Sequence, residues 1–370
     1  MKKLHKEVIM LGDATHNTLG AVRSFAEAGV RVILLLIGED DPCNVAHSRW
    51  LKHGNLIKLR NLDEAEEVLE KLPHDNRLLV CTFDAAAMWV DEREATLSAW
   101  FKTPCRGKQI GTLFSKDAQC RLARQYGLTV PESQVVERSE IEKQDWAPNQ
   151  KYPLLLKPLV STDGEKSDIH ICHKPEDVTS ALQADSHCTN FIVQEYIDKE
   201  YELNCSGVVT EDDIIISGGI QKIRHYPPIV GACSFGIFRP LSELNIEIGP
   251  IKKFLRASNY HGPFSVEMLH TSDGKNYFLE VNFRNDGLAY ASTSARANLH
   301  GVYAGAVKYD ASQVRRTYMM NYSIDYLFAQ SGDVSKLQWW RDFLRTRSFI
   351  NINFRDLAPT LRHYSSKFKR

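Results

Sequence analysis

The chain is constrained most by the heptapeptide FLEVNFR, residues 278–284. Read with the two-residue period of a β-strand, its Leu279, Val281 and Phe283 point to one face, and this apolar face belongs in a core. The other face carries Phe278, Glu280, Asn282 and Arg284. An anion, an amide and a cation in a row are costly to hold together unless something binds there. The heptapeptide therefore predicts a strand that buries one face and binds a ligand with the other.

A second strand pattern, FSVEMLH, lies just upstream, and Asp273-Gly274 between the two strands is a strong signal for a two-residue hairpin turn. A turn that closes tightly there places Met268 opposite Leu279 and Glu267 opposite Glu280. The two glutamates are then neighbours on the same face of the hairpin.

Two carboxylates paired across strands repel each other. Glu267, Glu280 and Asn282 together form an oxygen-only cluster, and Mg²⁺ favours carboxylates combined with substrate phosphates. The alternative is the solvated outer face of an edge hairpin, which usually mixes Lys and Glu so that the charges cancel. Here the cation, Arg284, follows the carboxylates in sequence and does not lie opposite them. This order favours a metal site.

Composition sets broad limits. A length of 370 residues predicts two or three domains, and 43% hydrophobic with 25% charged residues is typical of a globular protein. Lys plus Arg and Asp plus Glu both total 46, so the overall charge indicates neither a nucleic acid nor an acidic membrane surface as partner. Eight scattered cysteines without a CxxC pair argue against zinc and for a reducing compartment. The longest apolar run is strand-sized, which predicts no membrane span and a cytoplasmic protein.

The N-terminal part is predicted to be a β-α-β unit that opens a parallel sheet. Residues 8–12 and 32–37 have strand patterns, and residues 17–28 between them form a predicted helix that ends at Gly29. The loop 12–17 lies at the carboxyl end of the first strand, where such sheets bind ligands. It is not a GxGxxG loop, which argues against a dinucleotide site, and a plain connection explains it equally well.

A loosened pattern around residues 103–111 predicts a domain boundary. Strand patterns at 152–158 and 169–172 flank a loop of small polar residues, an arrangement that can present backbone N–H groups to phosphate. That loop lacks the GxxxxGK[ST] pattern, and alone it is better explained as a surface hairpin. The Pro/Gly-rich stretch 224–236 is predicted to be a long loop, and residues 294–306 are predicted to be a helix.

Taken in order, these features resemble the ATP-grasp superfamily, in particular carboxylate–amine ligases such as D-alanine–D-alanine ligase and D-aspartate ligase. The features are a β-α-β unit, Lys157 on a strand before a small-residue loop, a Gln-Glu-Tyr-Ile strand, and Glu267 followed by the Glu280-x-Asn282-x-Arg284 pattern. The resemblance implies an α/β (α+β) ATP-grasp fold, in which an N-terminal β-α-β parallel-sheet domain precedes two α+β subdomains that clasp ATP. The pattern departs from many relatives at Phe283, where they carry Pro, and in a phosphate loop with fewer glycines.

The resemblance also implies a division of the chain. Residues 1–112 would form the N-terminal domain, 113–193 the central lid subdomain, and 194–310 the C-terminal subdomain with the Mg²⁺ and ATP site. Residues 311–370 would be a C-terminal extension that lies outside the resemblance, and no chemistry is assigned to it.

The resemblance implies ATP and Mg²⁺ (or Mn²⁺) as cofactors and gives the matching residues roles. Phosphate contacts would come from Lys116, Lys157 and a lid loop that contains Ser161, Thr162, Gly164 and Ser167. The backbone of a hinge strand, Glu195, Tyr196 and Ile197, would bind adenine, and Glu202 the ribose hydroxyls. The metal ligands would be Glu267, Glu280 and Asn282, and the charge-neutralising catalytic cations Lys222 and Arg284.

The implied reaction joins a carboxylate, from an amino acid or small peptide, to an amine through an acyl phosphate, releasing ADP and phosphate. Four residues are predicted substrate contacts: His16, Arg224, Ser234 and Arg296. Two alternatives stay open, a nucleotide-binding regulatory protein without turnover and a carboxylase that uses bicarbonate. The expected partners are small-molecule substrates, without nucleic acid or a membrane span, and a homodimer is compatible with the sequence.

Overall fold

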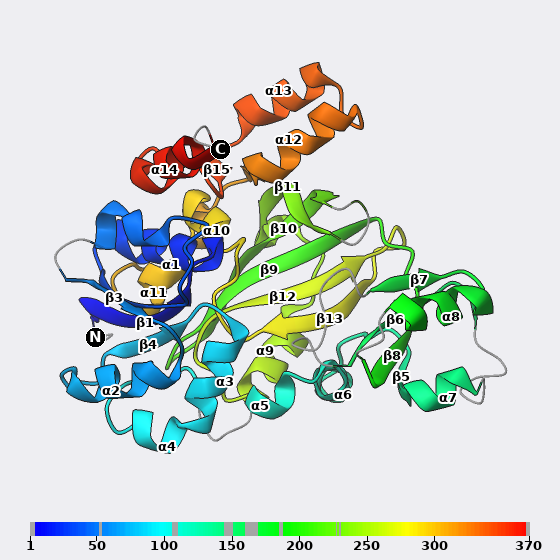
Figure 1. Ribbon diagram of the computed structural model, residues 1–370, viewed down its shortest axis with the longest axis horizontal. Helices are drawn as coiled ribbons and strands as arrows, with labels where there is room; N and C mark the ends of the chain where they lie inside the picture. The colour runs from blue at the N-terminus through cyan, green and yellow to red at the C-terminus, as the bar shows by residue number, and fades with distance from the viewer. Residues whose placement is uncertain are drawn as a thin grey trace.

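The structure is a computed structural model that describes residues 4–51, 54–105, 110–143, 151–159, 169–184, 188–226, 228 and 231–367. Three sheets organise it (Figure 1): a parallel N-terminal sheet, a small antiparallel sheet, and a large sheet between them. The mixture of parallel and antiparallel sheets confirms the predicted α/β (α+β) class. No helix in these ranges is long and apolar enough to cross a membrane.

The N-terminal sheet has the strand order β3-β2-β1-β4, and all of its pairs are parallel. Helix α1 connects β1 to β2 and ends before Gly29, whose φ of 76° only glycine adopts without strain. This confirms the predicted β-α-β opening. The elements are β1 (Glu7–Asp13), α1 (His16–Glu27), β2 (Arg31–Ile37), two 3-10 helices (Val45–His47 and Arg49–Leu51), β3 (Leu56–Leu59), α2 (Asp63–Lys71), β4 (Leu78–Cys81), α3 (Asp84–Glu92) and α4 (Glu94–Leu97).

The small sheet follows two helices that lead away from the N-terminal sheet. Its order is β5-β8-β6-β7, with helices α7 and α8 against it (Figure 1). The apolar side chains of β6 and β8 alternate into a core of their own that includes Leu154, Leu156 and Phe191. The elements are α5 (Ile110–Leu113), α6 (Lys116–Gln125), β5 (Ser133–Glu137), α7 (Arg138–Glu142), β6 (Leu154–Pro158), β7 (His170–Cys172), α8 (Pro175–Ala184) and β8 (Asn190–Glu195).

The large sheet has the order β13-β12-β9-β10-β11-β14-β15. The prediction of a long loop over 224–236 is wrong, because residues 224–226 continue β10 and β11 begins at Ala232. Tertiary pairing of β11 with both β10 and β14 overrides the Pro/Gly composition there. The elements are β9 (Tyr201–Val209), β10 (Ile214–Tyr226), β11 (Ala232–Pro240), a 3-10 helix (Leu241–Glu243), α9 (Ile248–Ala257), β12 (Gly262–His270) and β13 (Asn276–Asn282).

The β12–β13 hairpin differs from its prediction in two ways, and their effects on the strand register cancel at Glu267 and Glu280. The turn is a five-residue loop, since His270 pairs with Asn276, and a bulge then leaves Leu279 unpaired. Glu267 therefore still lies opposite Glu280, as predicted, but Met268 lies opposite Phe278 and not opposite Leu279.

The bulge also reverses which of the first two residues, Phe278 or Leu279, faces the core. Phe278 is fully buried in the core with Val281 and Phe283, whereas Leu279 lines a cavity beside Glu280. The predicted placement of Phe278 on the polar face and Leu279 in the core is therefore wrong, because strict alternation cannot anticipate one extra residue.

The C-terminal part contributes two strands to the large sheet. Strand β14 pairs with β11, and β15 pairs with β14. Near the chain end, Asp356 accepts a hydrogen bond from the buried Arg23 of α1, Nε to Oδ2 3.0 Å. The predicted helix over 294–306 is two short ones. The elements are α10 (Tyr290–Ser294), α11 (Leu299–Tyr303), a 3-10 helix (Ala311–Gln313), β14 (Thr317–Met320), α12 (Tyr322–Ser331), α13 (Lys336–Arg345), β15 (Ser348–Phe349) and α14 (Leu357–Lys367).

Candidate active site

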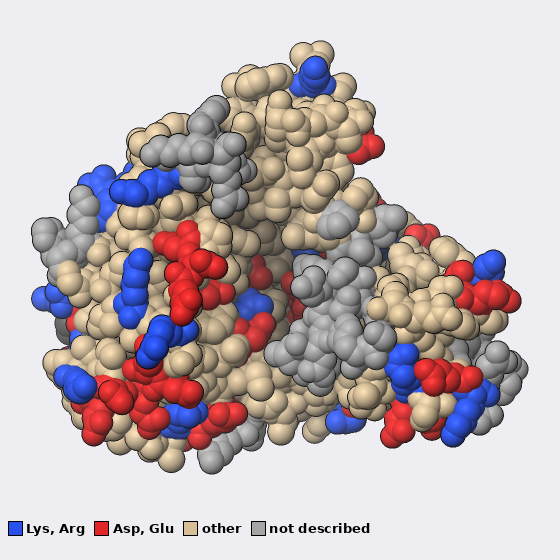
Figure 2. All heavy atoms as spheres, in the orientation of Figure 1, with Lys and Arg blue, Asp and Glu red and all other residues tan. Residues whose placement is uncertain are grey.

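A cavity of about 310 Å³ lies where the small sheet, the start of α6 and the β12–β13 hairpin meet. This volume is at the lower end of the usual range for small-molecule sites. Figure 2 shows acidic and basic side chains gathered in a hollow between the N-terminal part and the small sheet. The described residues give the cavity nine charged side chains: Asp84, Lys116, Lys157, Lys199, Glu202, Lys222, Glu267, Glu280 and Arg284. We call it the charged cavity.

The two glutamates of the hairpin face each other at one wall of the charged cavity. The pKa of Glu280 is raised, first by burial and then by the negative charge of Glu267, although Lys116, Lys157 and Arg284 act in the opposite direction. Asn282 donates from Nδ2 to Ser265 Oγ at 3.1 Å and lies 3.4 Å from Glu267 Oε1. The carboxylate of Glu280 is thus held where its charge is not fully compensated.

This wall fits a hard divalent cation. Within the described ranges no group of three or more His, Cys, Asp or Glu side chains could hold a metal ion, so a metal here would rely on two carboxylates and one amide. Such an incomplete set suits Mg²⁺, which takes one or two carboxylates and completes its octahedron with phosphate oxygens and water. A bound cation would also relieve the repulsion that raises the pKa of Glu280.

Lys222 connects the metal wall to a third carboxylate. Its Nζ lies 3.0 Å from Glu267 Oε2 and 2.9 Å from Glu202 Oε2, and the side chain is only 4% exposed. Burial disfavours its charge, but the two glutamates raise the pKa of Lys222 above its usual value. Burial also acts against charge on Glu202, whose pKa is nevertheless held well below its usual range by His225, Lys222 and Lys199. Lys222 and Glu202 therefore both remain ionised at neutral pH.

Two further lysines face the metal wall from other elements. Lys116 is the first residue of α6, and Lys157 lies on β6, where its Nζ donates to Gln194 Oε1 at 3.0 Å. Burial and the nearby charge of Lys116 lower the pKa of Lys157 to about 8, and Glu280 opposes this change. Cations that repel each other in this way form a site prepared for a polyanion.

One part of the charged cavity is lined by apolar side chains from both the small sheet and the hairpin. Leu155 and Ile171 come from the small sheet, and Leu269 and Leu279 come from the hairpin. The chain runs past this region after β8, at Tyr196 and Ile197, and in the described structure no hydrogen bond uses the backbone of these two residues. Free backbone donors and acceptors beside apolar walls suit a planar heterocycle.

Arg284 is fixed from the N-terminal part of the chain. It makes a bidentate ion pair with Asp84, the first residue of α3, with Nε to Oδ1 at 2.7 Å and Nη2 to Oδ2 at 3.1 Å. Nη2 also donates to Asn282 Oδ1 at 3.1 Å. The next residue, Asn285, is buried and donates to the Asn17 carbonyl at 2.6 Å. These bonds hold the cation beside the metal wall.

Comparison with known proteins identifies this arrangement of sheets. An N5-carboxyaminoimidazole synthase from Aspergillus clavatus, solved with ADP and 5-aminoimidazole ribonucleotide, superposes with a TM-score of 0.67 over 85% of this chain and 82% of its own, at 15% identity. The biotin carboxylase domain of a Hydrogenobacter thermophilus 2-oxoglutarate carboxylase, solved with MgADP and bicarbonate, gives 0.62 over 86% and 74% at 13% identity. The chain has the ATP-grasp fold.

An L-amino acid ligase from Bacillus licheniformis shares the same fold, with a TM-score of 0.61 over 86% of this chain and 80% of its own, at 13% identity. No protein-family model and no curated protein matches the sequence. The ATP-grasp fold that the sequence predicts is therefore confirmed by structural similarity alone, and the division into domains stays a prediction.

The ATP-grasp fold brings most of the predicted site residues together in the charged cavity. These are Lys116, Lys157, Tyr196, Ile197, Glu202, Lys222, Glu267, Glu280, Asn282 and Arg284. Glu195 ends β8 with its side chain exposed, and its Oε2 accepts from the Glu132 backbone N–H at 3.3 Å. Ser161, Thr162, Gly164 and Ser167 lie outside the described residues.

The predicted substrate contacts are not brought to the charged cavity in the described structure. Arg224 is paired with the buried Asp325 and Asp342 at 2.7 and 2.6 Å, and Ser234 donates to Asp325 at 2.8 Å. Their environment is that of a structural network that fastens α12 and α13 to β10 and β11. The sequence does not reveal this burial, because Asp325 and Asp342 lie about a hundred residues later in the chain.

The other two predicted contacts have different surroundings. Arg296 is exposed at the end of α10, with a φ of 68°. His16 starts α1 near Arg284, and burial lowers its pKa although Asp286 and Asp13 favour the charged form. It lies so close to Gly287 that a Cβ there would approach His16 Nε2 to 2.5 Å. His16 is a neighbour of the site, and neither residue lines the charged cavity.

Several residues that line the charged cavity were not predicted, and three of them hold parts of the site in place. Asp84 fixes Arg284, Lys199 pairs with Glu202, and Gln119 of α6 accepts from the Val281 N–H at 2.7 Å and so fastens α6 to β13. The sequence signal for Asp84 is its position just after a buried strand, at the carboxyl edge of a parallel sheet. Gln119 has no comparable signal, because its partner is a backbone group 162 residues away.

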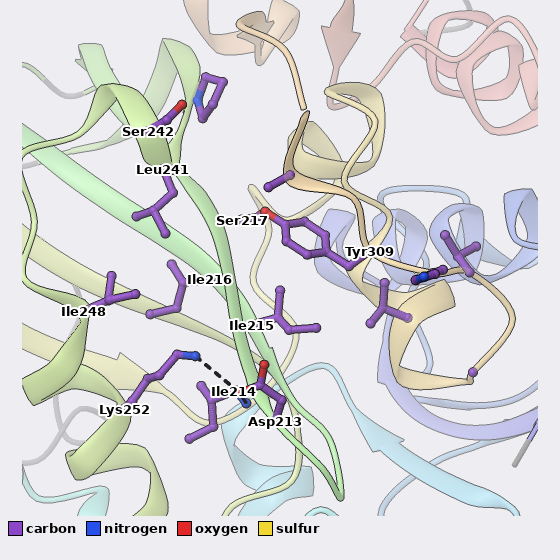
Figure 3. A pocket seen from close by; sticks show the side chains of 16 residues that line it. Asp213, Ile214, Ile215, Ile216, Ser217, Leu241, Ser242, Ile248, Lys252 and Tyr309 are labelled. Carbon is purple, nitrogen blue, oxygen red and sulfur yellow. Dashed lines mark hydrogen bonds and ion pairs between the residues drawn. The ribbon is translucent and has the colours of Figure 1, made fainter. Parts of the chain in front are cut away.

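A second and larger cavity, of about 1010 Å³, lies at the other end of β10 (Figure 3). Ile214, Ile215 and Ile216 line it, and Tyr309 extends into it from the opposite side. Its clearest polar feature is the ion pair between Lys252 Nζ and Asp213 Oδ1 at 3.3 Å. We call this second cavity the apolar groove. Among the described residues, none lines both the apolar groove and the charged cavity.

Proposed function

We propose that the protein is an ATP- and Mg²⁺-dependent carboxylate–amine ligase that forms an amide and releases ADP and phosphate. The observation that carries the proposal is the meeting, in one cavity, of a carboxylate pair at Glu267 and Glu280 with cations at Lys116, Lys157 and Arg284. Phosphoryl transfer is catalysed mainly by positioning and by neutralising charge, and these residues supply both.

ATP would lie along the charged cavity. Its base would occupy the apolar end, with its edge toward the free backbone of Tyr196 and Ile197, and Glu202 would accept hydrogen bonds from the ribose. Lys116 and Lys157 would bind the phosphates from the small-sheet side. The like charges of the two lysines, which lower the pKa of Lys157 together with burial, would then be compensated by the polyphosphate.

Glu267, Glu280 and Asn282 would hold Mg²⁺. A bound Mg²⁺ supplies Lewis-acid polarisation of the terminal phosphate and orients it for displacement. Lys222 lies 3.0 Å from Glu267 and so stays beside the metal wall, where its ammonium neutralises negative charge on the transferred phosphoryl group.

Arg284 would act on the acyl group. The carboxylate of the substrate attacks the terminal phosphorus and ADP leaves, which gives an acyl phosphate. Attack of an amine on the acyl carbon then expels phosphate, and the amine loses a proton. The guanidinium, held by Asp84 beside Asn282, can stabilise the oxyanion that forms in this second step.

A second function, carboxylation, is supported by one neighbour, the biotin carboxylase domain solved with bicarbonate. In that reaction bicarbonate replaces the organic carboxylate as the phosphoryl acceptor. The same lysines and arginine would neutralise the charge on the transferred group. The third alternative, nucleotide binding without turnover, does not need the carboxylate pair and is less well supported by a cavity that retains it.

An ADP-release screen separates these functions. Purified protein with MgATP is offered amino acids of both enantiomers, singly and in pairs, with a parallel series in bicarbonate, and the nucleotide products are separated by chromatography. The ligase proposal expects equal amounts of ADP and phosphate that depend on both a carboxylate and an amine. ADP release that requires bicarbonate supports the carboxylase instead. AMP with pyrophosphate contradicts both, and no release under any condition favours a binding protein.

A further inference from the structure

Helix α13 is apolar on two opposite sides. Trp339 and Phe343 point inward, and Trp339 is 2% exposed in an aromatic cluster with Tyr322 of α12. On the outer side, Leu337, Trp340 and Leu344 are 74%, 54% and 73% exposed. Exposed apolar stripes of this kind mark interaction sites.

The spacing makes the outer side one continuous stripe. Leu337, Trp340 and Leu344 follow each other at i, i+3 and i+7, so they lie above one another along the helix. Other exposed apolar residues lie in the same C-terminal region of the chain. Of the twelve large hydrophobic residues that are exposed in the described structure, seven lie in this C-terminal region: Tyr326, Leu337, Trp340, Leu344, Phe354, Leu357 and Leu361. Four of these seven lie on the two neighbouring helices α12 and α13.

The charges beside the stripe are positive. Lys336 flanks one edge and Arg341 the other, Arg347 follows the helix, and in the described structure none of the three has an ion-pair partner. The acid of the helix, Asp342, is 1% exposed and already paired with Arg224. Asp333, exposed in the turn before the helix, is one acid against these three cations, so the surface around the stripe is apolar with a net positive charge.

Three kinds of occupant can be compared. A second copy of the chain would place Lys336 and Arg341 against the same cations, which repel. A groove on a partner protein would have to admit a whole helix. A lipid surface needs neither charge reversal nor a groove, and α13 lies at the outer edge of the molecule, beside α12 and at the same edge as α14, where a flat surface can reach it (Figure 1). Leu and Trp bordered by Lys and Arg is the composition of interfacial helices.

We propose that α13 docks the protein on an anionic membrane surface. The Leu337, Trp340 and Leu344 side chains enter the boundary between headgroups and acyl chains, and Lys336, Arg341 and Arg347 contact the anionic headgroups. The buried network of Arg224 with Asp325 and Asp342 holds the helix rigidly on the large sheet. This docking is independent of the proposed ligase activity, because α13 contributes no residue to the charged cavity.

Vesicle flotation tests the proposal. The full chain is mixed with vesicles of phosphatidylcholine alone or with phosphatidylglycerol, at low and high salt. We expect binding only to the anionic vesicles, weakened by salt because the headgroup attraction is screened. The triple variant Leu337→Ser, Trp340→Ser, Leu344→Ser and the double variant Lys336→Glu, Arg341→Glu should each lower the bound fraction at least about tenfold.

Matched controls keep the test specific. Val135→Ser removes an apolar side chain that is 43% exposed on the small sheet, and Lys71→Glu with Lys253→Glu makes the same charge change elsewhere. These variants should bind like the original protein, and thermal unfolding shows that each variant is folded. Absence of binding to anionic vesicles overturns the proposal. So does binding that the stripe variants leave unchanged, and so does concentration-dependent dimerisation that Trp340→Ser abolishes while vesicle binding is absent.

Discussion

The charged cavity and the apolar groove lie toward opposite ends of β10, and they differ in whether the charges that line them are neutralised. The groove is about three times larger, at about 1010 Å³ against 310 Å³, yet its Asp213 and Lys252 neutralise each other. The smaller cavity keeps Glu280 beside Glu267 and Lys157 near Lys116, and burial together with these neighbours displaces the pKa values of Glu280 and Lys157. Uncompensated charge marks the chemistry better than volume does.

The largest effect is expected at the carboxylate pair. Glu280→Gln should lower turnover about 10³-fold or more, since Lewis-acid stabilisation is worth several kcal/mol and each 1.36 kcal/mol is tenfold. The apo protein should unfold at the same or a higher temperature, because one charge of a repelling pair is removed. Turnover and thermal unfolding measure the two effects.

The matched control is an acid of the groove. Asp213→Asn removes a carboxylate that pairs with Lys252 outside the charged cavity, and it should leave turnover unchanged. Normal turnover of Glu280→Gln at ordinary Mg²⁺ would contradict the metal assignment, and equal losses in both variants would remove the distinction between the two cavities.

Arg284→Ala should lower kcat about 10²- to 10³-fold, as expected when one preorganised donor to a developing oxyanion is lost. ATP affinity should change much less, because the arginine is assigned to the acyl group. Steady-state kinetics with ATP varied at saturating co-substrates separates the two parameters. An effect confined to the KM for ATP would instead place Arg284 on the nucleotide phosphates.

The pH dependence of ATP affinity is a smaller effect. Burial and Lys116 lower the pKa of Lys157 to about 8, so the free side chain loses its proton as pH rises through 8. Bound phosphates keep it charged, and above pH 8 binding must take up a proton. Affinity should therefore fall by up to about tenfold per pH unit there.

Lys157→Arg serves as the control for this titration, since arginine stays charged throughout. Its affinity for a nonhydrolysable ATP analogue, measured by calorimetry, should be flat across the same range. Identical pH profiles in the variant and the original protein would show that another group titrates.

The smallest effect is expected in the groove. Ile215→Ala removes a half-buried apolar side chain at its wall, and kcat should stay within about twofold while stability falls by about 2 kcal/mol or less. Kinetics and denaturant unfolding report both. A large loss of kcat without a loss of stability would mean that the groove takes part in the reaction.

The sequence predicted the parts of the site that lie close together along the chain. Glu267 opposite Glu280 was predicted from a tight turn at Asp273-Gly274, and the pairing holds because the longer loop and the bulge at Leu279, both missed, cancel each other. The parts that depend on distant elements could not be predicted. Arg224 is buried by Asp325 and Asp342, and Arg284 is held by Asp84, some 200 residues earlier. Such pairs follow only from the folded chain.

The most direct test of the central claim is a crystal structure with Mg²⁺ and a nonhydrolysable ATP analogue. We predict phosphate density between Lys116, Lys157 and the carboxylates of Glu267 and Glu280, with the metal bound to those carboxylates and to Asn282. The base should lie against the backbone of Tyr196 and Ile197. Nucleotide bound in the apolar groove with an empty charged cavity would contradict the account.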